Sequence, residues 1–236
     1  MTEIKFYDHS EVELVNVSAD DEMVARAAWV STVGDEAKEK DADKIGGLIN
    51  YLMRDKHGSP FEHNMFTFFI KTPLFVRSEF HRHRVGWSYN EESGRYSQMK
   101  PHFYVIPEGR KLTQTGKPGH YIFAEGTEHQ LNITKSEQQQ QAHEAYTSYQ
   151  YLLDRGVAKE VARMHLPLNL MTSFWATCNS RSLMHFLSLR TKDDSATFPS
   201  NPQWEINEVA NQMEESFKQQ MPLTYDAWNK NGRVSP

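Results

Sequence analysis

Cysteine, long apolar runs and an excess of positive charge are what this sequence has least of. Its 236 residues include one cysteine, Cys178, which excludes an internal disulfide and is typical of a reducing compartment. No stretch reaches the roughly 18 apolar residues that span a bilayer. The first residues also lack the basic and apolar layout of a signal peptide. We therefore expect a soluble, cytoplasmic protein without a membrane partner.

The formal net charge of −5 argues against a general nucleic-acid binder, because such proteins normally carry a basic surface. Against this acidic average, the stretch from position 77 to 95 contains six basic residues: Arg77, His81, Arg82, His83, Arg84 and Arg95. A local cationic cluster on an acidic protein favours a small anionic ligand over a polymer.

The composition, with 38% hydrophobic and 24% charged residues, predicts a globular chain. No linker or repeat divides it, so we expect one α+β domain over residues 1–236. Strands are predicted within residues 3–17 and 65–70. Helices are predicted to begin at Ser18 and at Thr72, to cover about 41–56, 157–165, 179–190 and 204–221, and to run from a capping box at Ser136 and Gln139 to Asp154. Residues 85–96 are expected to form a long loop.

The arginines of the basic stretch are mixed with Trp87, Tyr89 and Tyr96. Arginine keeps its charge at any working pH and offers a planar fork of donors that suits phosphate. A solvated basic face is the simpler explanation for an arbitrary pair of arginines. The interleaved aromatic side chains make phosphate and ring binding credible, although composition alone does not identify the ligand.

Arg190 ends an apolar stripe formed by Leu183, Phe186 and Leu187 at helical spacing. An arginine on such a stripe is costly unless its charge is paired or binds a ligand. The alternative is that Arg190 extends into solvent at the helix end, where a cation also suits the helix dipole.

Several histidines could suggest a metal, but no zinc-type spacing is present and the neighbouring arginines would repel a cation. We therefore expect no metal site.

The string from Arg82 to Tyr96, R-H-R-V-G-W-S-Y-N-E-E-S-G-R-Y, closely resembles the signature of the flavin-dependent thymidylate synthases (the ThyX family). That signature is Arg-His-Arg, seven or eight residues and Ser, with an Asn-Glu-x-Ser-x-Arg-Tyr ending. Further blocks are similar to the family at residues 57–63, 160–163, 166–170, 179–183, 189–190 and 203–206, so the resemblance covers roughly residues 20–225.

The resemblance implies a twisted, mainly antiparallel sheet flanked by helices. It also implies a reaction, the reductive methylation of dUMP to dTMP. In that reaction 5,10-methylenetetrahydrofolate supplies the carbon, NADPH reduces FAD, and the reduced flavin supplies the hydride. The family forms homotetramers with flavin at the subunit interfaces, and we expect the same here.

Position by position, the resemblance also implies roles for individual residues. FAD would be bound by Ser59, Arg82, His83, Arg84, Val85, Glu91, Asn179, Arg181 and His185. The dUMP site would include Glu79, Arg82, Glu91, Glu92, Ser93, Gly94, Arg95, Arg163 and Arg190. His57 would lie on the folate side of the flavin, and Arg190 would be the catalytic residue, polarising the N3–C4 edge of the uracil.

Three features depart from the usual family pattern. The position of Glu79 is often Gln, His185 stands where some members have Asn, and residues 191–202 form a longer segment than usual.

No enzyme nucleophile is expected. Cys178 follows the apolar run 174–177 and is predicted to be a buried, inert thiol. Ser93 has no base evident beside it and is expected to contact the ligand.

Two other functions stay open at this stage. One is a flavoprotein reductase that acts on another nucleotide. The other is a non-catalytic nucleotide- or RNA-binding module that uses the arginine and aromatic stretch as a grip.

Overall fold

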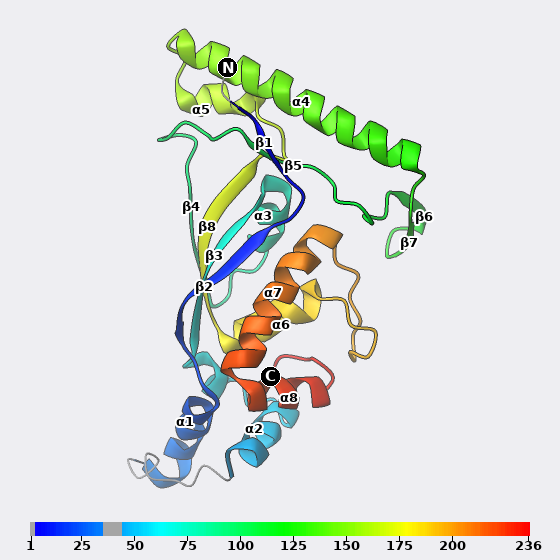
Figure 1. Ribbon diagram of the computed structural model, residues 1–236. Coiled ribbons are helices and arrows are strands. Elements are labelled where there is room, and N and C mark those ends of the chain that lie inside the picture. Colours follow the sequence, from blue (N-terminus) through cyan, green and yellow to red (C-terminus); the bar gives the residue numbers. More distant parts are fainter. Residues whose placement is uncertain (1–2, 35–43) are drawn as a thin grey trace. The chain divides into compact units, whose positions relative to one another are not determined.

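The largest sheet of the computed structural model has four antiparallel strands in the order β2-β3-β8-β4 (Figure 1). The structure describes residues 3–34 and 44–236. The four strands are β2 Glu11–Ser18, β3 Met65–Pro73, β8 Met171–Asn179 and β4 Trp87–Glu91.

Strand β3 is a run of aromatic and β-branched residues whose alternate side chains are buried. Phe66, Phe68 and Ile70 are all 0% exposed, as expected where every second residue faces the same side of a sheet. The predicted helix start at Thr72 is wrong, because the strand continues to Pro73 and helix α3 (Leu74–Phe80) follows it. The buried Thr72 hydroxyl lies 2.9 Å from the hydroxyl of Ser10 and is used inside the fold.

Contacts between residues divide the chain into two compact units. The first unit comprises residues 1–10, 71–78 and 91–173, and the second comprises residues 11–70, 79–90 and 174–236. The division falls inside β3, β4 and β8, so each unit contains part of all three strands.

The first unit packs the long helix α4 over a small aromatic core. Its elements are β1 Lys5–Tyr7, β5 His102–Tyr104, β6 Thr113–Lys117, β7 His120–Ala124, α4 Glu128–Asp154, α5 Lys159–Ala162 and the 3-10 helix η4 Arg163–His165. Strands β1 and β5 are parallel, and β6 and β7 form an antiparallel hairpin. Phe103 and Tyr149 are fully buried in the core, where the Met99 N–H donates to the Tyr149 hydroxyl at 3.0 Å.

Helix α4 ends at Asp154 as predicted, but its N-cap is Thr127, nine residues before the expected N-cap Ser136. The capping box is formed instead by Thr127 and Gln130, whose side chains satisfy each other's backbone N–H groups. Both pairs fit the sequence pattern of an N-terminal capping box, and the helix begins at the earlier one.

The second unit consists mainly of helices beside the other parts of the sheet. They are α1 Asp21–Val33, α2 Ile45–Arg54, the 3-10 helix η3 Ser59–Glu62, α6 Ser180–Arg190, α7 Trp204–Gln220 and α8 Pro222–Lys230. Helices α6 and α7 confirm the predicted helices at 179–190 and 204–221. Helix α2 lies within the predicted range 41–56, of which residues 41–43 fall outside the described part.

Two neighbouring aspartates organise the start of α1. Asp20, not the expected Ser18, is the N-cap, and its Oδ1 accepts from the Met23 N–H at 2.6 Å. Asp21 is buried and caps α8 as well, because its two carboxylate oxygens accept from the N–H groups of Leu223 and Thr224 and from the Thr224 hydroxyl. These contacts join two helices about 200 residues apart in sequence.

The predicted loop at 85–96 contains strand β4, so that part of the prediction is wrong. Trp87 and Tyr89 stack with ring centroids 5.7 Å apart, and the Tyr89 hydroxyl donates to the carbonyl oxygens of Phe80 and His83. The alternate aromatic residues give the segment one half-buried face and one exposed face, as in a strand.

None of the helices in residues 3–34 and 44–236 is both long and apolar enough to cross a bilayer.

Candidate functional site

Arg190 makes the central polar contacts of the second unit's candidate site. Its Nη1 donates to Glu79 Oε2 at 2.6 Å, and its Nε donates to His83 Nε2 at 3.2 Å. Glu79 lies in α3, His83 lies just beyond it, and Arg190 is the last residue of α6. Leu183, Phe186 and Leu187 are 0% exposed, which confirms the predicted apolar stripe, and the charge of Arg190 is paired at its end.

Glu79 has one carboxylate oxygen that is available to a ligand. Its Oε1 is buried and has no hydrogen-bond partner among the described residues. Burial raises the pKa of the Glu79 carboxyl, and the neighbouring Arg190 charge opposes this shift. Because a buried acceptor without a partner costs free energy, Glu79 Oε1 is a candidate acceptor for a ligand N–H or hydroxyl.

His83 is a neutral support for Arg190 in this structure. It is 6% exposed and packs against the ring of Phe186, with centroids 4.9 Å apart. Burial, followed by the charge of Arg190, lowers its pKa to about 4. An unprotonated Nε2 is what the Arg190 N–H requires as acceptor, so His83 adds no charge to the cationic stretch around it.

The remaining residues of the Arg-His-Arg segment face outward. Arg82 and Arg84 are exposed, and Val85 is 90% exposed. Gly86 follows with a positive φ of 70°. The Ser182 hydroxyl donates to the Val85 carbonyl oxygen at 2.9 Å, which fixes this segment against the first turn of α6.

The start of α6 carries the predicted residues Asn179 and Arg181. Asn179 caps the helix, with its Oδ1 accepting from the Ser182 N–H at 2.8 Å. Arg181 is exposed, and its guanidinium donates to Glu62 Oε1 at 2.5 Å and to the carbonyl oxygen of Pro236 at 2.6 Å. An exposed arginine in the first turn of a capped helix suits an anionic group.

The block around Ser59 lies against the same helix. Ser59 begins η3, and the Ser180 hydroxyl donates to the Phe61 carbonyl oxygen at 2.6 Å. His57 is exposed and stacks on Tyr51 with ring centroids 5.6 Å apart. The second unit thus contains, in three separate chain segments, the predicted residues Ser59, Glu79, Arg82, His83, Arg84, Val85, Asn179, Arg181, His185 and Arg190, with His57 just before η3.

The first unit holds the other predicted nucleotide residues. Glu91 Oε1 accepts from the Thr172 hydroxyl at 2.8 Å and lies 3.0 Å from Arg77 Nε. The Glu92 N–H donates to the Ser173 carbonyl oxygen at 3.0 Å. These bonds fix two carboxylates where β4 ends, beside β8.

The turn after Glu92 brings Ser93, Gly94 and Arg95 together with Arg163. The Ser93 hydroxyl accepts from the Arg95 N–H at 3.3 Å, so it caps the turn. A Cβ on the buried Gly94 would lie 2.9 Å from Met99 Sδ and 3.1 Å from Arg163 Cδ, so the turn packs closely against both side chains. Arg95 pairs with Glu160 at 3.0 Å, and Arg163 is exposed.

Two residues important to these sites had no predicted role. Arg77 was seen only as one basic residue of the stretch, but it is the ion-pair partner of Glu91. Tyr89 was seen as a possible ring contact, whereas it fastens the end of α3 through two carbonyl oxygens. The i, i+2 spacing of Trp87 and Tyr89 is the signal that could have indicated a strand.

The thiol of Cys178 is a poor nucleophile in this setting. It is 1% exposed in β8, and burial raises its pKa well above the usual value. Among the described residues, no group of three or more His, Cys, Asp or Glu side chains is arranged to hold a metal ion.

Comparison with known proteins covers almost the whole chain. Residues 13–223 match the family described as "Thymidylate synthase complementing protein". The flavin-dependent thymidylate synthase of Streptomyces avermitilis is 56% identical over 228 residues, which cover 95% of this chain and 93% of that protein. The corresponding protein of Tropheryma whipplei (strain TW08/27) is 48% identical over 98% of this chain and 97% of that protein.

Among solved structures, the UMP/dUMP methylase PolB from Streptomyces cacaoi bound with 5-Br dUMP is similar with a TM-score of 0.93. It is 45% identical, and the match covers 99% of this chain and 100% of that chain. The match confirms the expected α+β fold.

The four-stranded sheet and its helices define an α+β protein in which the exposed Arg82 and Arg84 lie in the segment held against the capped helix α6. The chain belongs to the flavin-dependent thymidylate synthase family, as its signature predicted.

Proposed function

We propose that this protein catalyses the reductive methylation of dUMP to dTMP, with 5,10-methylenetetrahydrofolate as carbon donor and NADPH as reductant. The observation that most directly supports this proposal is that Arg190 is fixed beside Glu79, in a chain that belongs to this family. Arg190 would donate to the uracil as negative charge develops on its N3–C4 edge. Donors already fixed where charge develops are among the largest contributions to catalysis.

Several residues of the second unit fit FAD. Arg82 and Arg84 offer exposed charges for its phosphates, and Val85 offers an exposed apolar contact for a ring. The first turn of α6 adds backbone N–H groups and Arg181, which exchanges its bond to Glu62 for an anionic group of the cofactor. Bound FAD supplies the hydride, while these residues bind and orient it.

The nucleotide residues of the first unit fit a phosphate monoester. Arg163 is exposed, and Arg95 is held in place by Glu160. The turn at Ser93 and Gly94 presents small groups that allow a ligand to approach the backbone closely. We assign Ser93 to ligand contact and expect no covalent enzyme intermediate.

UMP is a second candidate substrate. The PolB structure, 45% identical to this chain, is named a UMP/dUMP methylase, so a 2′-hydroxyl is accepted by a protein of this fold. The free Glu79 Oε1 is an acceptor that a ribose hydroxyl or a uracil N–H could equally use.

The deciding experiment measures tritium release from [5-³H]dUMP and from [5-³H]UMP, with and without NADPH and methylenetetrahydrofolate. The proposal expects a yellow protein that bleaches with NADPH and releases tritium from dUMP only when both are present. NADPH oxidation without tritium release would instead indicate a flavoprotein reductase. A colourless protein that FAD cannot reconstitute would indicate a non-catalytic nucleotide- or RNA-binding module.

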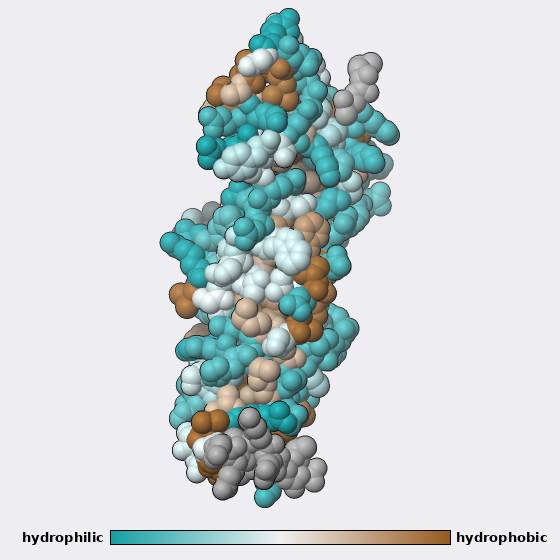
Figure 2. Space-filling view, turned by 90° about the vertical axis from the view of Figure 1, so that its left-hand side faces the viewer, coloured by the Kyte–Doolittle hydropathy of each residue, from teal (hydrophilic) through white to brown (hydrophobic). Residues whose placement is uncertain are grey.

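We also propose a homotetramer with the flavin at subunit interfaces. Apolar side chains reach the surface at several places on the face shown in Figure 2. In the first unit, Met164 and Leu168, which lie shortly after Arg163 in the chain, are 76% and 68% exposed. Clustered exposed apolar side chains mark interaction surfaces.

A further inference from the structure

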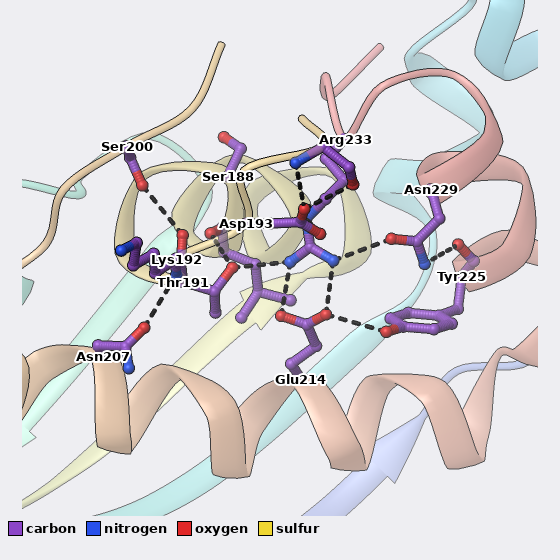
Figure 3. A network of polar contacts seen from close by, with 12 residues as sticks. Ser188, Thr191, Lys192, Asp193, Ser200, Asn207, Glu214, Tyr225, Asn229 and Arg233 are labelled. Carbon is purple, nitrogen blue, oxygen red and sulfur yellow. Dashed lines mark hydrogen bonds and ion pairs between the residues drawn. The ribbon is translucent and has the colours of Figure 1, made fainter. Parts of the chain in front are cut away.

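Arg233 is an almost fully buried arginine near the C-terminal end of the described chain, and all its N–H groups face acceptors. It is 6% exposed. Nη1 donates to Glu214 Oε1 at 2.8 Å and to Asn229 Oδ1 at 2.9 Å, and Nη2 donates to Glu214 Oε2 at 2.7 Å (Figure 3). Nε lies 3.4 Å from Asp193 Oδ2. The fork of arginine fits this arrangement, and the three donors of lysine would not.

The second donor of Nη2 joins this network to the end of α6. It donates to the Thr191 hydroxyl at 2.7 Å, and that hydroxyl donates in turn to the Leu187 carbonyl oxygen at 2.7 Å. Thr191 is the C-cap of α6 and follows Arg190 directly. The Thr191 hydroxyl therefore links Arg233 to the helix turn that carries Arg190.

The backbone on both sides of Thr191 is fixed as well. The Lys192 N–H donates to Asn207 Oδ1 at 2.9 Å, and the Ser200 hydroxyl donates to the Thr191 carbonyl oxygen at 3.0 Å. The chain leaving α6 is therefore held to α7 and to the 191–202 segment. Arg190 is the last residue before this fixed point.

Arg233 adopts a backbone conformation that is costly for its residue type. Its φ is +58°, in the left-handed region that residues other than glycine rarely adopt. Its guanidinium lies 4.1 Å from the centre of the Trp228 ring, and its pKa is raised through Glu214 and Asp193 despite the opposing effect of burial. Packing alone does not require a buried, fully paired cation in a strained backbone conformation. Strained residues of this kind cluster near functional sites.

We propose that Arg233 is a positioning residue for Arg190. It acts through the Thr191 hydroxyl and holds the last turn of α6, so that the Arg190 guanidinium stays against Glu79 and His83. This inference rests on the proposed function, because it assumes that Arg190 binds the uracil nucleotide.

The test uses Thr191→Val, since removing Arg233 itself leaves the half-buried Glu214 without its cationic partner and can prevent folding. Thr191→Ser keeps the hydroxyl. Thr224→Val is a matched control, because Thr224 is also buried and its hydroxyl bonds Asp21 away from α6. In the FAD-loaded proteins, dUMP affinity is measured by flavin absorbance, together with thermal unfolding.

We expect Thr191→Val to weaken dUMP binding about tenfold, Thr191→Ser to restore it, and Thr224→Val to change it less than about twofold at a similar loss of thermal stability. In an Arg190→Ala background, Thr191→Val should have almost no further effect, because its consequence passes through Arg190.

Two results overturn the inference. The first is that Thr191→Val and Thr224→Val weaken dUMP binding equally. The second is that Thr191→Val has the same effect with and without Arg190. Either result would mean a purely structural role. If Arg190→Ala alone binds dUMP as tightly as the unaltered protein, the role of Arg190 in the proposed function fails first, and the positioning role fails with it.

Discussion

Arg190 illustrates how a single charge can be identified from its surroundings. The sequence placed it on an apolar stripe, where either a ligand or solvent could receive its charge. The structure places it against Glu79 and His83, with a side-chain exposure of 20%. Arg190 and an ionised Glu79 carry no net charge together, so what Arg190 offers to developing negative charge is a fixed set of charged N–H donors.

At this scale the first prediction concerns catalysis. Arg190→Ala should keep FAD and the fold but lower dTMP formation by about 10²–10³-fold, as removal of one donor to a developing oxyanion does. Turnover is measured by tritium release and FAD by absorbance. Lys192→Ala, which removes the exposed cation two residues later, is the control, and retained turnover in Arg190→Ala would remove Arg190 from the catalytic role.

The second prediction concerns His83 and pH. Its pKa is lowered from 6.5 to about 4, so below pH 6.5 the unfolded chain binds a proton that the folded chain does not. The free energy of unfolding should therefore fall as pH drops from 6.5 towards 4, by about 3 kcal/mol. In His83→Gln, which keeps an acceptor for Arg190, this loss should be largely absent.

Denaturant unfolding at several pH values measures the effect. His120→Gln removes an exposed histidine and should leave the pH dependence unchanged. An identical slope in His83→Gln and the unaltered protein between pH 4 and 6.5 would contradict a neutral, buried His83.

At the scale of helices and strands, some elements could be predicted from local sequence patterns and others could not. Helices α6 and α7 were predicted because their apolar spacing is strong and their ends carry recognisable signals. Strand β4 was not predicted, because Ser88, Asn90 and a neighbouring Gly86 resemble loop residues. The ring of Trp87 packs against Phe80, and the ring of Tyr89 packs against Phe174. Both partners are buried, and these tertiary contacts favour the strand.

Gly86 gives the prediction at this scale. Its φ is +70°, and a Cβ would lie 2.2 Å from Ser182 Oγ. Gly86→Ala should therefore displace the segment from α6, break the Ser182 to Val85 bond, and weaken FAD binding about tenfold or more, since each 1.4 kcal/mol is a factor of ten. Flavin titration of the apoprotein measures this.

Gly156→Ala is the matched control for Gly86→Ala. Gly156 has a similar φ of +78°, but nothing lies within 4 Å of its added Cβ. It imposes the same backbone strain without the clash, so it should lower thermal stability and leave FAD affinity unchanged. Equal FAD affinities in the two variants would show that the contact of Gly86 with α6 does not shape the cofactor site.

For the whole molecule, the prediction concerns the number of subunits in solution. We expect a homotetramer, about four times the 27.4 kDa chain mass, by light scattering. Leu168→Glu should lower the assembly state, because an exposed leucine at an interface would be replaced by a charge that must be desolvated. Gln139→Glu adds the same charge at an exposed polar position of α4 and should leave the tetramer intact; a monomeric unaltered protein would contradict the proposal.

The sequence by itself determined the family, the basic stretch at residues 77–95 and the main helices, because these depend on residue identity and local spacing. Only the tertiary structure decided that His83 is neutral, that Glu79 has a free oxygen and that Arg77 pairs with Glu91. It also decided that α8 exists and is capped by Asp21 from the far end of the chain. Burial and pairing depend on which distant residues meet, and no local pattern contains that information.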